Sequence, residues 1–352
     1  MNPEVSAGTG LSKTRGVAGF PNGEIYRVDT SDPKFNLSRL YLNQDFGLGG
    51  ESERLESDQN QLAQIKDSDR ITVVAGKFSL NDFFDQNTYS HDPRTQFLNW
   101  ALMDNGAWDY AADTRGYTVG AMLEYHRSKW AVRFGSVAVP KFANQIDLEY
   151  QISTARSDNL EFEYHYQFRG HPGISRILAY ENHAHMGNYR TTLNTPGDNL
   201  DVTLSRTNSV KYGFGFNAEQ EFSADLGSFM RLGWNDGATE TWAFTEIDRT
   251  LTAGAVLKGS AWRRNQDTVG IAAIINGLSK DHANYLEAGG YGFLVGDGKL
   301  NYGPEEILET YYSFQAWKQG WISADYQFVN HPGYNSDRGP VSIFSGRLHY
   351  AL

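Results

Sequence analysis

The stretch Asn159–Arg169 alternates apolar and polar side chains without exception. Because successive side chains of a β-strand point to opposite faces, Leu160 and its alternates form an aromatic face and Glu161 and its alternates a charged one. In a water-soluble sheet the apolar face packs on a core and the charged face meets solvent. In an outer-membrane barrel the apolar face meets lipid and the charged face lines a channel. The stretch therefore predicts one of two architectures, and the rest of the chain has to distinguish them.

The same alternation recurs along the chain and predicts about thirteen strands. The connections between these strands alternate in length: short turns lie near residues 127, 171, 222, 262 and 319, and longer loops separate the resulting hairpins. Short turns at one end and long loops at the other are typical of a transmembrane antiparallel β-barrel. The expected strand centres are residues 41, 74, 121, 134, 164, 178, 213, 231, 253, 271, 312, 325 and 347.

Tryptophans next to the short turns point to the same architecture. Trp130, Trp262, Trp317 and Trp321 all lie beside a predicted short turn. Aromatic residues form girdles at the membrane interfaces of barrels, so this position favours a sheet in contact with lipid. A β-barrel in the outer membrane of a Gram-negative cell is the expected fold and location.

Composition removes several other classes of protein. The chain has 352 residues, no cysteine and a formal net charge of -11. The absence of cysteine excludes disulfides, thiol nucleophiles and thiolate metal sites. A net acidic chain does not predict a nucleic-acid partner. No apolar run approaches the roughly 18 residues of a membrane-spanning helix.

Three segments depart from the alternation. Residues 1–34 are rich in Gly, Pro, Ser and Asp, which predicts a loop. Residues 51–70 are polar, and the run Gln-Leu-Ala-Gln-Ile-Lys at 61–66 suits a short helix. Residues 79–115 form a long aromatic interruption, and a loop of this kind is more often functional than a passive linker. The expected organisation is therefore a loop-like segment over 1–34 and a barrel over 35–352 that contains the long loop 79–115.

Four segments resemble the OprB-type carbohydrate-selective porins. They are Ala75–Asp85, Gln96–Ala101, Asp113–Tyr117 and Asn335–Pro340, and the similarity extends from about Phe35 to the end of the chain. The resemblance implies a 16-stranded outer-membrane barrel that lets monosaccharides such as glucose diffuse into the periplasm. It implies no enzymatic activity and no organic cofactor. Because about thirteen strands are predicted here, we expect a chain that lacks about three N-terminal strands of the family architecture.

Candidate site residues follow from the strand phase and from the long loop. A pore selects by the size, charge and stacking surfaces of its narrowest part, so charged groups and aromatic rings are the relevant side chains. Guanidinium and carboxylate groups match sugar hydroxyls, and aromatic rings match the faces of sugar rings. The polar strand face predicts a lumen lined by Arg39, Tyr41, Asp45, Arg133, Glu161, Glu163, His165, Arg231, Glu309, Asp325 and Arg347. The long loop predicts a constriction formed by Phe83, Phe84, Phe97, Trp100, Trp108, Asp109 and Arg115.

Alternative interpretations remain open from the residues alone. The lumen charges could simply keep a wet channel hydrated and form ion-pair ladders, and the aromatic residues of the loop could form a small core. At the level of the whole chain, the alternatives are a soluble glycan-binding β-sandwich, a barrel enzyme and a polysaccharide exporter. No residue pattern predicts a catalytic centre or a metal site.

Overall fold

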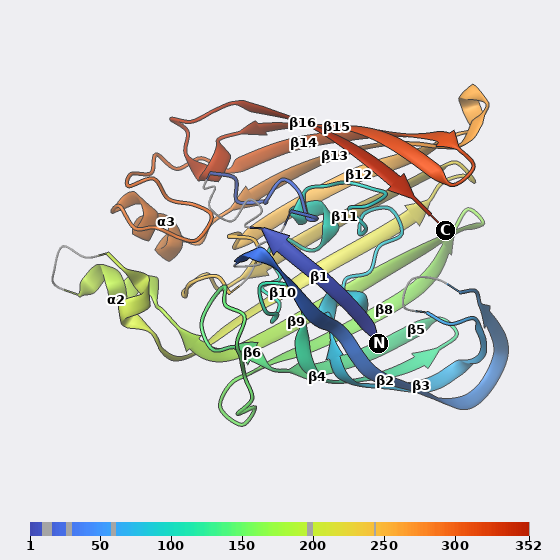
Figure 1. Ribbon diagram of the computed structural model, residues 1–352, viewed down its shortest axis with the longest axis horizontal. Helices are drawn as coiled ribbons and strands as arrows, with labels where there is room; N and C mark the ends of the chain where they lie inside the picture. Colours follow the sequence, from blue (N-terminus) through green and yellow to red (C-terminus); the bar gives the residue numbers. More distant parts are fainter. Residues whose placement is uncertain (9–15, 26–29, 58–60, 196–199, 243, 352) are drawn as a thin grey trace.

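The computed structural model of the chain is dominated by one antiparallel sheet that curves around a filled interior (Figure 1). The structure describes all residues except 9–15, 26–29, 58–60, 196–199, 243 and 352. Within the described residues the sheet has 14 strands, and each strand is hydrogen-bonded to the next along the chain, apart from a separate pair formed by β6 and β7. The two edge strands of the sheet are β1 and β16.

The strands of the first half are β1 (Asn2–Gly8), β2 (Thr30–Leu55), β3 (Gln64–Phe78), β4 (Thr118–Arg127), β5 (Trp130–Val137), β6 (Val139–Pro140), β7 (Leu148–Glu149), β8 (Arg156–Phe168) and β9 (His171–Met186). Those of the second half are β10 (Thr207–Glu221), β11 (Leu226–Asn235), β12 (Arg249–Gly259), β13 (Arg264–Gly277), β14 (Glu305–Trp317), β15 (Gly320–Asn330) and β16 (Val341–Tyr350).

Helical segments lie in the connections. They are α1 (Trp100–Met103), α2 (Tyr189–Asn194) and α3 (Lys280–Glu287), together with the 3₁₀ turns η1 (Leu80–Asp82), η2 (Val202–Ser205), η3 (Ser260–Trp262) and η4 (Pro332–Tyr334). In the described residues no helix is long and apolar enough to cross a membrane. Figure 1 places α2 and α3 at the end of the sheet with long loops, opposite the tight hairpin turns.

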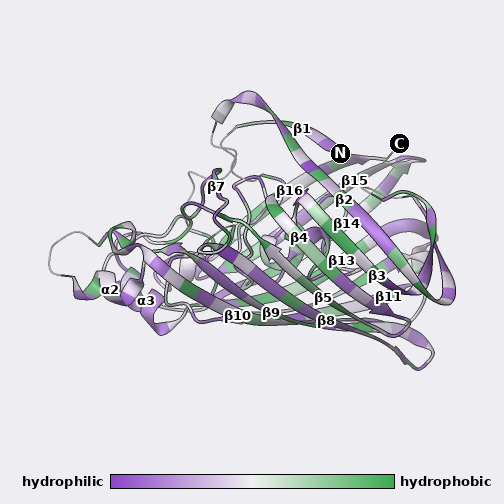
Figure 2. Ribbon diagram, turned by 90° about the horizontal axis from the view of Figure 1, so that it is seen from below, coloured by the Kyte–Doolittle hydropathy of each residue, from purple (hydrophilic) through white to green (hydrophobic). Residues whose placement is uncertain are grey.

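The polarity of the sheet is inverted relative to a water-soluble protein. On β8 the apolar Leu160 and Phe162 are 49% and 42% exposed, whereas the charged Glu161 and Glu163 are 1% and 6% exposed. On β10 the fully buried side chain is Lys211, beside the exposed Tyr212. Figure 2 shows this alternation as hydrophilic and hydrophobic bands along the strands. The apolar side chains therefore face outward and the charged ones face the enclosed space, as a membrane barrel requires.

The predicted strands are confirmed. Each of the thirteen expected centres falls within one strand of the 14-stranded sheet, from residue 41 in β2 to residue 347 in β16. A single continuous sheet of this size excludes the alternative of a two-sheet sandwich, in which two apolar faces would pack against each other.

Two local predictions are corrected. Asn2–Gly8 forms β1 and pairs with the first part of β2, so the expected loop over residues 1–34 contains a strand; residues 9–15 and 26–29 of that segment lie outside the described residues. The run at 61–66 is not a helix. Its second half belongs to β3, where Gln64 pairs with Leu55 and Lys66 with Glu53, because cross-strand pairing overrides a weak helical propensity.

We predict that the outward face of β10 tolerates no cation at its centre. Phe214 is 55% exposed at mid-strand, and replacement by arginine (Phe214→Arg) should lower the free energy of unfolding in lipid bilayers by about 2–4 kcal/mol. Phe222→Arg in the following turn should cost about 0–1 kcal/mol, because that position lies near the membrane interface. Denaturant titrations of both variants refolded into liposomes test the difference, and equal costs would contradict an outward face in contact with hydrocarbon.

Candidate functional site

The space enclosed by the sheet is largely filled by two segments. One is the long loop, whose predicted span of 79–115 extends in the structure to residue 117, just before β4; the other is an N-terminal segment formed by residues 16–25. The two segments are hydrogen-bonded to each other. The backbone amide of Trp100 donates to the carbonyls of Gly19 and Phe20 at 3.1 and 3.0 Å, and that of Gly23 donates to Leu98 at 2.9 Å. The inward-facing polar side chains of the strands hold both segments in place.

A buried ion pair between Arg231 and Asp85 joins the sheet to the long loop. The guanidinium of Arg231 on β11 lies 2.9 Å from the Asp85 carboxylate and donates to the carbonyls of Ser90 and Leu102 at 2.8 and 2.9 Å. Arg231 is 0% exposed. Asp85 in turn donates its backbone amide to Glu161 on β8 at 2.8 Å. The planar, multi-donor guanidinium suits this position because it satisfies several loop acceptors at once.

A second buried ion pair, between Lys211 on β10 and Asp109, joins the sheet to a later part of the long loop. The ammonium of Lys211 is 2.8 Å from the carboxylate of Asp109, and this carboxylate also accepts the backbone amide of Trp242 at 2.8 and 2.9 Å. Both charges are almost completely buried. A charge removed from water in this way is tolerated only when it is paired and hydrogen-bonded.

Two glutamates on β14 bind backbone amides instead of cations. Glu309 accepts the amides of Leu98 and Asn99 in the long loop, the latter at 3.1 Å. Glu305 accepts those of Ala18 and Gly19 in the N-terminal segment at 2.8 and 2.9 Å. These contacts use inward-facing carboxylates to fix the backbone of the two segments inside the sheet.

An ion-pair ladder runs along the wall formed by β4, β5, β8, β9 and β10. Arg133 contacts Glu124, Glu161 and Glu163, and Arg176 contacts Glu163 and Glu219. The alternation of cations and anions lets each charge lie between opposite ones, which offsets the cost of removing it from water.

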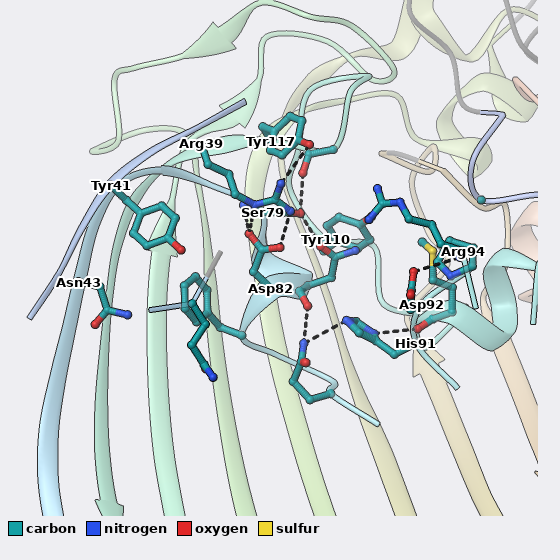
Figure 3. A pocket seen from close by; sticks show the side chains of 18 of the residues that line it. Arg39, Tyr41, Asn43, Ser79, Asp82, His91, Asp92, Arg94, Tyr110 and Tyr117 are labelled. Carbon is teal, nitrogen blue, oxygen red and sulfur yellow. Dashed lines mark hydrogen bonds and ion pairs between the residues drawn. The ribbon is translucent and has the colours of Figure 1, made fainter. Parts of the chain in front are cut away.

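A cavity of about 590 Å³ remains between the long loop, β2 and β3. Its walls come from four parts of the chain, namely β2, the long loop, the N-terminal segment through Gly23 and Glu24, and residues 61–66. Tyr41 and Asn43 project into it from β2, and His91, Asp92 and Arg94 face them from the loop (Figure 3). The cavity is the open space that the anchored loop leaves beside the wall.

One wall of the cavity is formed by a bidentate ion pair. The guanidinium of Arg39 donates to the two carboxylate oxygens of Asp82 at 2.8 and 2.6 Å (Figure 3). Arg39 also lies 5.1 Å from the centre of the Tyr117 ring, whose hydroxyl donates to Glu4 of β1 at 2.8 Å. The pair presents a fixed set of polar atoms to the cavity, because a fork-to-fork contact leaves little rotational freedom.

The floor of the cavity contains a histidine next to a buried carboxyl group. His91 lines the cavity, and its Nδ1 lies 3.7 Å from Oδ1 of Asp104. Burial raises the pKa of Asp104 to about 6; the nearby His91 opposes this shift, and the Asp85 carboxylate adds to it. Asn81 donates to the other carboxylate oxygen of Asp104 at 3.2 Å.

The structure divides the candidate residues of the sequence analysis into two groups. The first group lines the cavity and consists of Arg39, Tyr41, Asp45, Phe83, Trp100 and Arg115. The second group is used in contacts between the wall and the enclosed segments or within the wall: Arg133, Glu161, Glu163, His165, Arg231, Glu309, Asp325, Arg347, Phe84, Phe97, Trp108 and Asp109.

Several cavity-lining residues were not candidates in the sequence analysis. Glu24 belongs to a segment predicted as a loop, and Gln61, Leu62 and Gln64 belong to the run predicted as a helix. Neither segment shows the alternation of apolar and polar residues from which inward-facing side chains could be predicted. The polar face of β2 provided a signal for Asn43, which lies on the same strand face as Tyr41 and Asp45.

Comparisons with known proteins identify the family. The family model described as "Carbohydrate-selective porin, OprB family" matches residues 1–352. The chain belongs to the OprB family. It is a porin of the Gram-negative outer membrane through which carbohydrates diffuse, and it is not an enzyme. The resemblance stated from the four sequence segments is thereby confirmed, and the barrel enzyme and polysaccharide exporter are excluded.

One solved structure, with a TM-score of 0.70, supports the fold. The high-pH structure of Pseudomonas putida OprB has a TM-score of 0.70 and 16% identity, over 98% of this chain and 80% of that one. The low-pH structure of the same protein has a TM-score of 0.47 and 13% identity, over 90% and 66%. Pseudomonas aeruginosa OccK5 (OpdH) has a TM-score of 0.45 and 8% identity, over 90% and 78%. No curated protein matches the chain.

We predict that the Arg231–Asp85 pair keeps the long loop in position. Arg231→Met leaves the Asp85 carboxylate buried without its cation, which should cost about 3–5 kcal/mol and release the loop, so that single-channel conductance rises and fluctuates. The double variant Arg231→Met/Asp85→Asn should recover part of the stability, because no unpaired charge remains. Planar-bilayer recordings and unfolding titrations test both variants, and a single variant with wild-type conductance and stability would contradict the anchoring role.

We also predict a pH-dependent stability from Asp104. Its pKa is raised in the folded protein, so the folded state holds this proton more tightly than the unfolded state does. The stabilisation is complete below about pH 4 and is lost as the pH rises through about 6. Between about pH 8 and pH 5 the wild-type free energy of unfolding should gain about 1–3 kcal/mol that Asp104→Asn lacks. Parallel pH slopes for the two proteins in detergent would show that Asp104 does not contribute.

Proposed function

We propose that the cavity beside β2 is the path that sugars take through this porin, and that the path favours neutral monosaccharides such as glucose. The observation that carries the proposal is the division of the inward-facing charges. Those on β8, β11 and β14 are buried against the long loop, whereas the Arg39–Asp82 pair, which also joins β2 to that loop, keeps 14% and 21% of its side chains exposed and lines the cavity.

The size of the cavity suits a small solute. Its volume of about 590 Å³ falls within the roughly 300–1,000 Å³ of pockets that enclose small molecules. A monosaccharide fits such a space with part of its hydration water. The loop and the wall therefore leave room for one sugar at a time at this level of the channel.

The charge balance of the lining favours an uncharged solute. Four cationic side chains (Arg39, Lys66, Arg94 and Arg115) and four anionic ones (Glu24, Asp45, Asp82 and Asp92) line the cavity. Three cation–anion pairs form among them: Arg39 with Asp82, Lys66 with Asp45, and Arg94 with Glu24. A neutral sugar can bridge such pairs through its hydroxyls, whereas an ion is attracted by one half of each pair and repelled by the other.

Aromatic rings in the cavity can contact the apolar faces of a sugar, while the ion pairs contact its hydroxyls. Tyr41 and Phe83 lie edge to face with their ring centres 6.0 Å apart, and both line the cavity. Trp100 and Tyr110 on the loop side are nearly buried and stack on Phe244, so they support the wall of the cavity and leave Tyr41 and Phe83 as the accessible rings. Ring faces of this kind match the C–H faces of a pyranose, and the adjacent ion pairs match its hydroxyls.

The curvature of the sheet supports a closed barrel around this path. The long loop is hydrogen-bonded to Arg39 near one edge of the sheet and to Arg347 on β16 at the other edge. One enclosed loop thus contacts strands from both ends of the strand order. A closed barrel in the membrane predicts faster gel migration of the unheated protein in SDS, and identical migration before and after heating would contradict it.

We predict that Tyr41→Ala/Phe83→Ala weakens the preference for sugar. In liposome-swelling assays the ratio of the glucose rate to that of an amino acid of equal size should fall about fivefold or more, because two ring contacts of about 0.5–1.5 kcal/mol each are lost. Tyr212→Ala, which removes an exposed ring on the outward face, is the matched control and should keep the wild-type ratio. An unchanged ratio in the double variant would contradict the assigned path.

A further inference from the structure

The hairpin formed by β2 and β3 is longer than any other in the sheet and curls at the end with the tight turns. β2 spans 26 residues and β3 spans 15. Figure 1 shows the hairpin bending back at the lower right instead of continuing straight out. Because the long loop enters the sheet from the opposite end, this hairpin lies at the periplasmic mouth, where porins have their short turns.

Two bulges account for the bend. The pairing of β2 with β3 shifts between Gly47 and Gly49 and again between Gly49 and Ser52, each time with one extra residue on β2. Gly49 and Gly50 have φ values of +96° and +88°, which residues with a Cβ rarely adopt. A bulged strand bends and twists more strongly than its partner. The amide of Gly49 donates to Asp67 at 2.9 Å, which holds the bulge in place.

An ion pair shows how far the hairpin folds back. Lys66 lies six residues before Thr72 on β3, and Thr72 pairs with Asp45 on β2. In a straight strand these six residues would separate Lys66 from Asp45 by about 20 Å. The Lys66 ammonium nevertheless lies 2.8 Å from the Asp45 carboxylate, inside the cavity. The strand has therefore turned toward the lumen.

The bend places the hairpin tip, defined here as residues 61–66, in the wall of the cavity. Gln61, Leu62, Gln64 and Lys66 all line it at its open rim, where Leu62 is 81% exposed, whereas the neighbouring Ile65 is not part of the lining. The tip thus adds two neutral amides and one apolar side chain to a cavity whose other walls are aromatic and ionic. Amide groups donate and accept hydrogen bonds without charge, which suits sugar hydroxyls.

We propose that the hairpin tip is a second carbohydrate-binding subsite at the periplasmic mouth, in which Gln64 and Leu62 contact a neutral sugar and the Lys66–Asp45 pair holds the tip in place. The proposal rests on the sugar path assigned above and extends it toward the exit. Sugar that has passed the Arg39–Asp82 pair then meets a further set of uncharged contacts before it is released.

Glucose titrations of single-channel conductance test the subsite. Leu62→Ala/Gln64→Ala should raise the glucose concentration that half-saturates the current reduction by about three- to tenfold, the effect of losing one or two weak polar and apolar contacts. Ile65→Ala, on the same tip but not part of the cavity lining, is the matched control and should keep the wild-type value. Equal values for the double variant and Ile65→Ala would overturn the subsite.

The role of the Lys66–Asp45 ion pair is tested separately. Lys66→Met keeps the side-chain length but removes the charge, so the tip should loosen, open-channel conductance should rise and glucose affinity should fall. Lys66→Arg keeps the pair and should restore both values. Wild-type behaviour of Lys66→Met would overturn the role of the Lys66–Asp45 pair.

The two proposals fail in different ways. If glucose does not reduce the wild-type current at all, both the sugar path and the subsite are wrong. If glucose reduces the wild-type current and Leu62→Ala/Gln64→Ala responds identically, only the subsite is wrong.

Discussion

The strands expose their apolar side chains outward, so the charged side chains are enclosed and must be paired inside the sheet. This requirement explains why a porin interior contains so much ordered chain. Arg231 reaches its acceptors only because Asp85 and the carbonyls of Ser90 and Leu102 converge on it. The long loop therefore neutralises the wall, and the wall fixes the loop; neither arrangement is stable without the other.

We propose that the distribution of these pairs decides where solutes can pass. The walls made by β8, β11 and β14 are occupied by the long loop, since Glu161, Arg231 and Glu309 all bind it. Beside β2 the ion pair of Arg39 and Asp82 also joins the wall to the loop, but it stays partly exposed to the cavity. We propose that sugar selectivity arises from the groups that stay exposed at the cavity, and that the curled hairpin adds contacts at the exit.

The period of two made the faces of the strands predictable, because burial reverses with each residue. The inward position of Glu309 follows from that period, but its partners, the amides of Leu98 and Asn99, do not. The loop has no period, so its rings could not be sorted: Phe83 lines the cavity while the adjacent Phe84 is buried against the wall. The hairpin tip was missed because the bend depends on bulges formed by glycines with positive φ and on the Lys66–Asp45 contact, both set by pairing between strands.

Thiol labelling of single-cysteine variants in planar bilayers tests the central claim, the location of the path, most directly. The chain contains no cysteine, so each variant carries one reactive group. Asn43→Cys places it in the cavity, and Thr252→Cys places it on the buried inner face of β12. A bulky water-soluble thiol reagent should lower conductance and glucose flux through Asn43→Cys and leave those of Thr252→Cys unchanged. Full modification of Asn43→Cys without any loss of conductance or glucose flux would contradict a path beside β2.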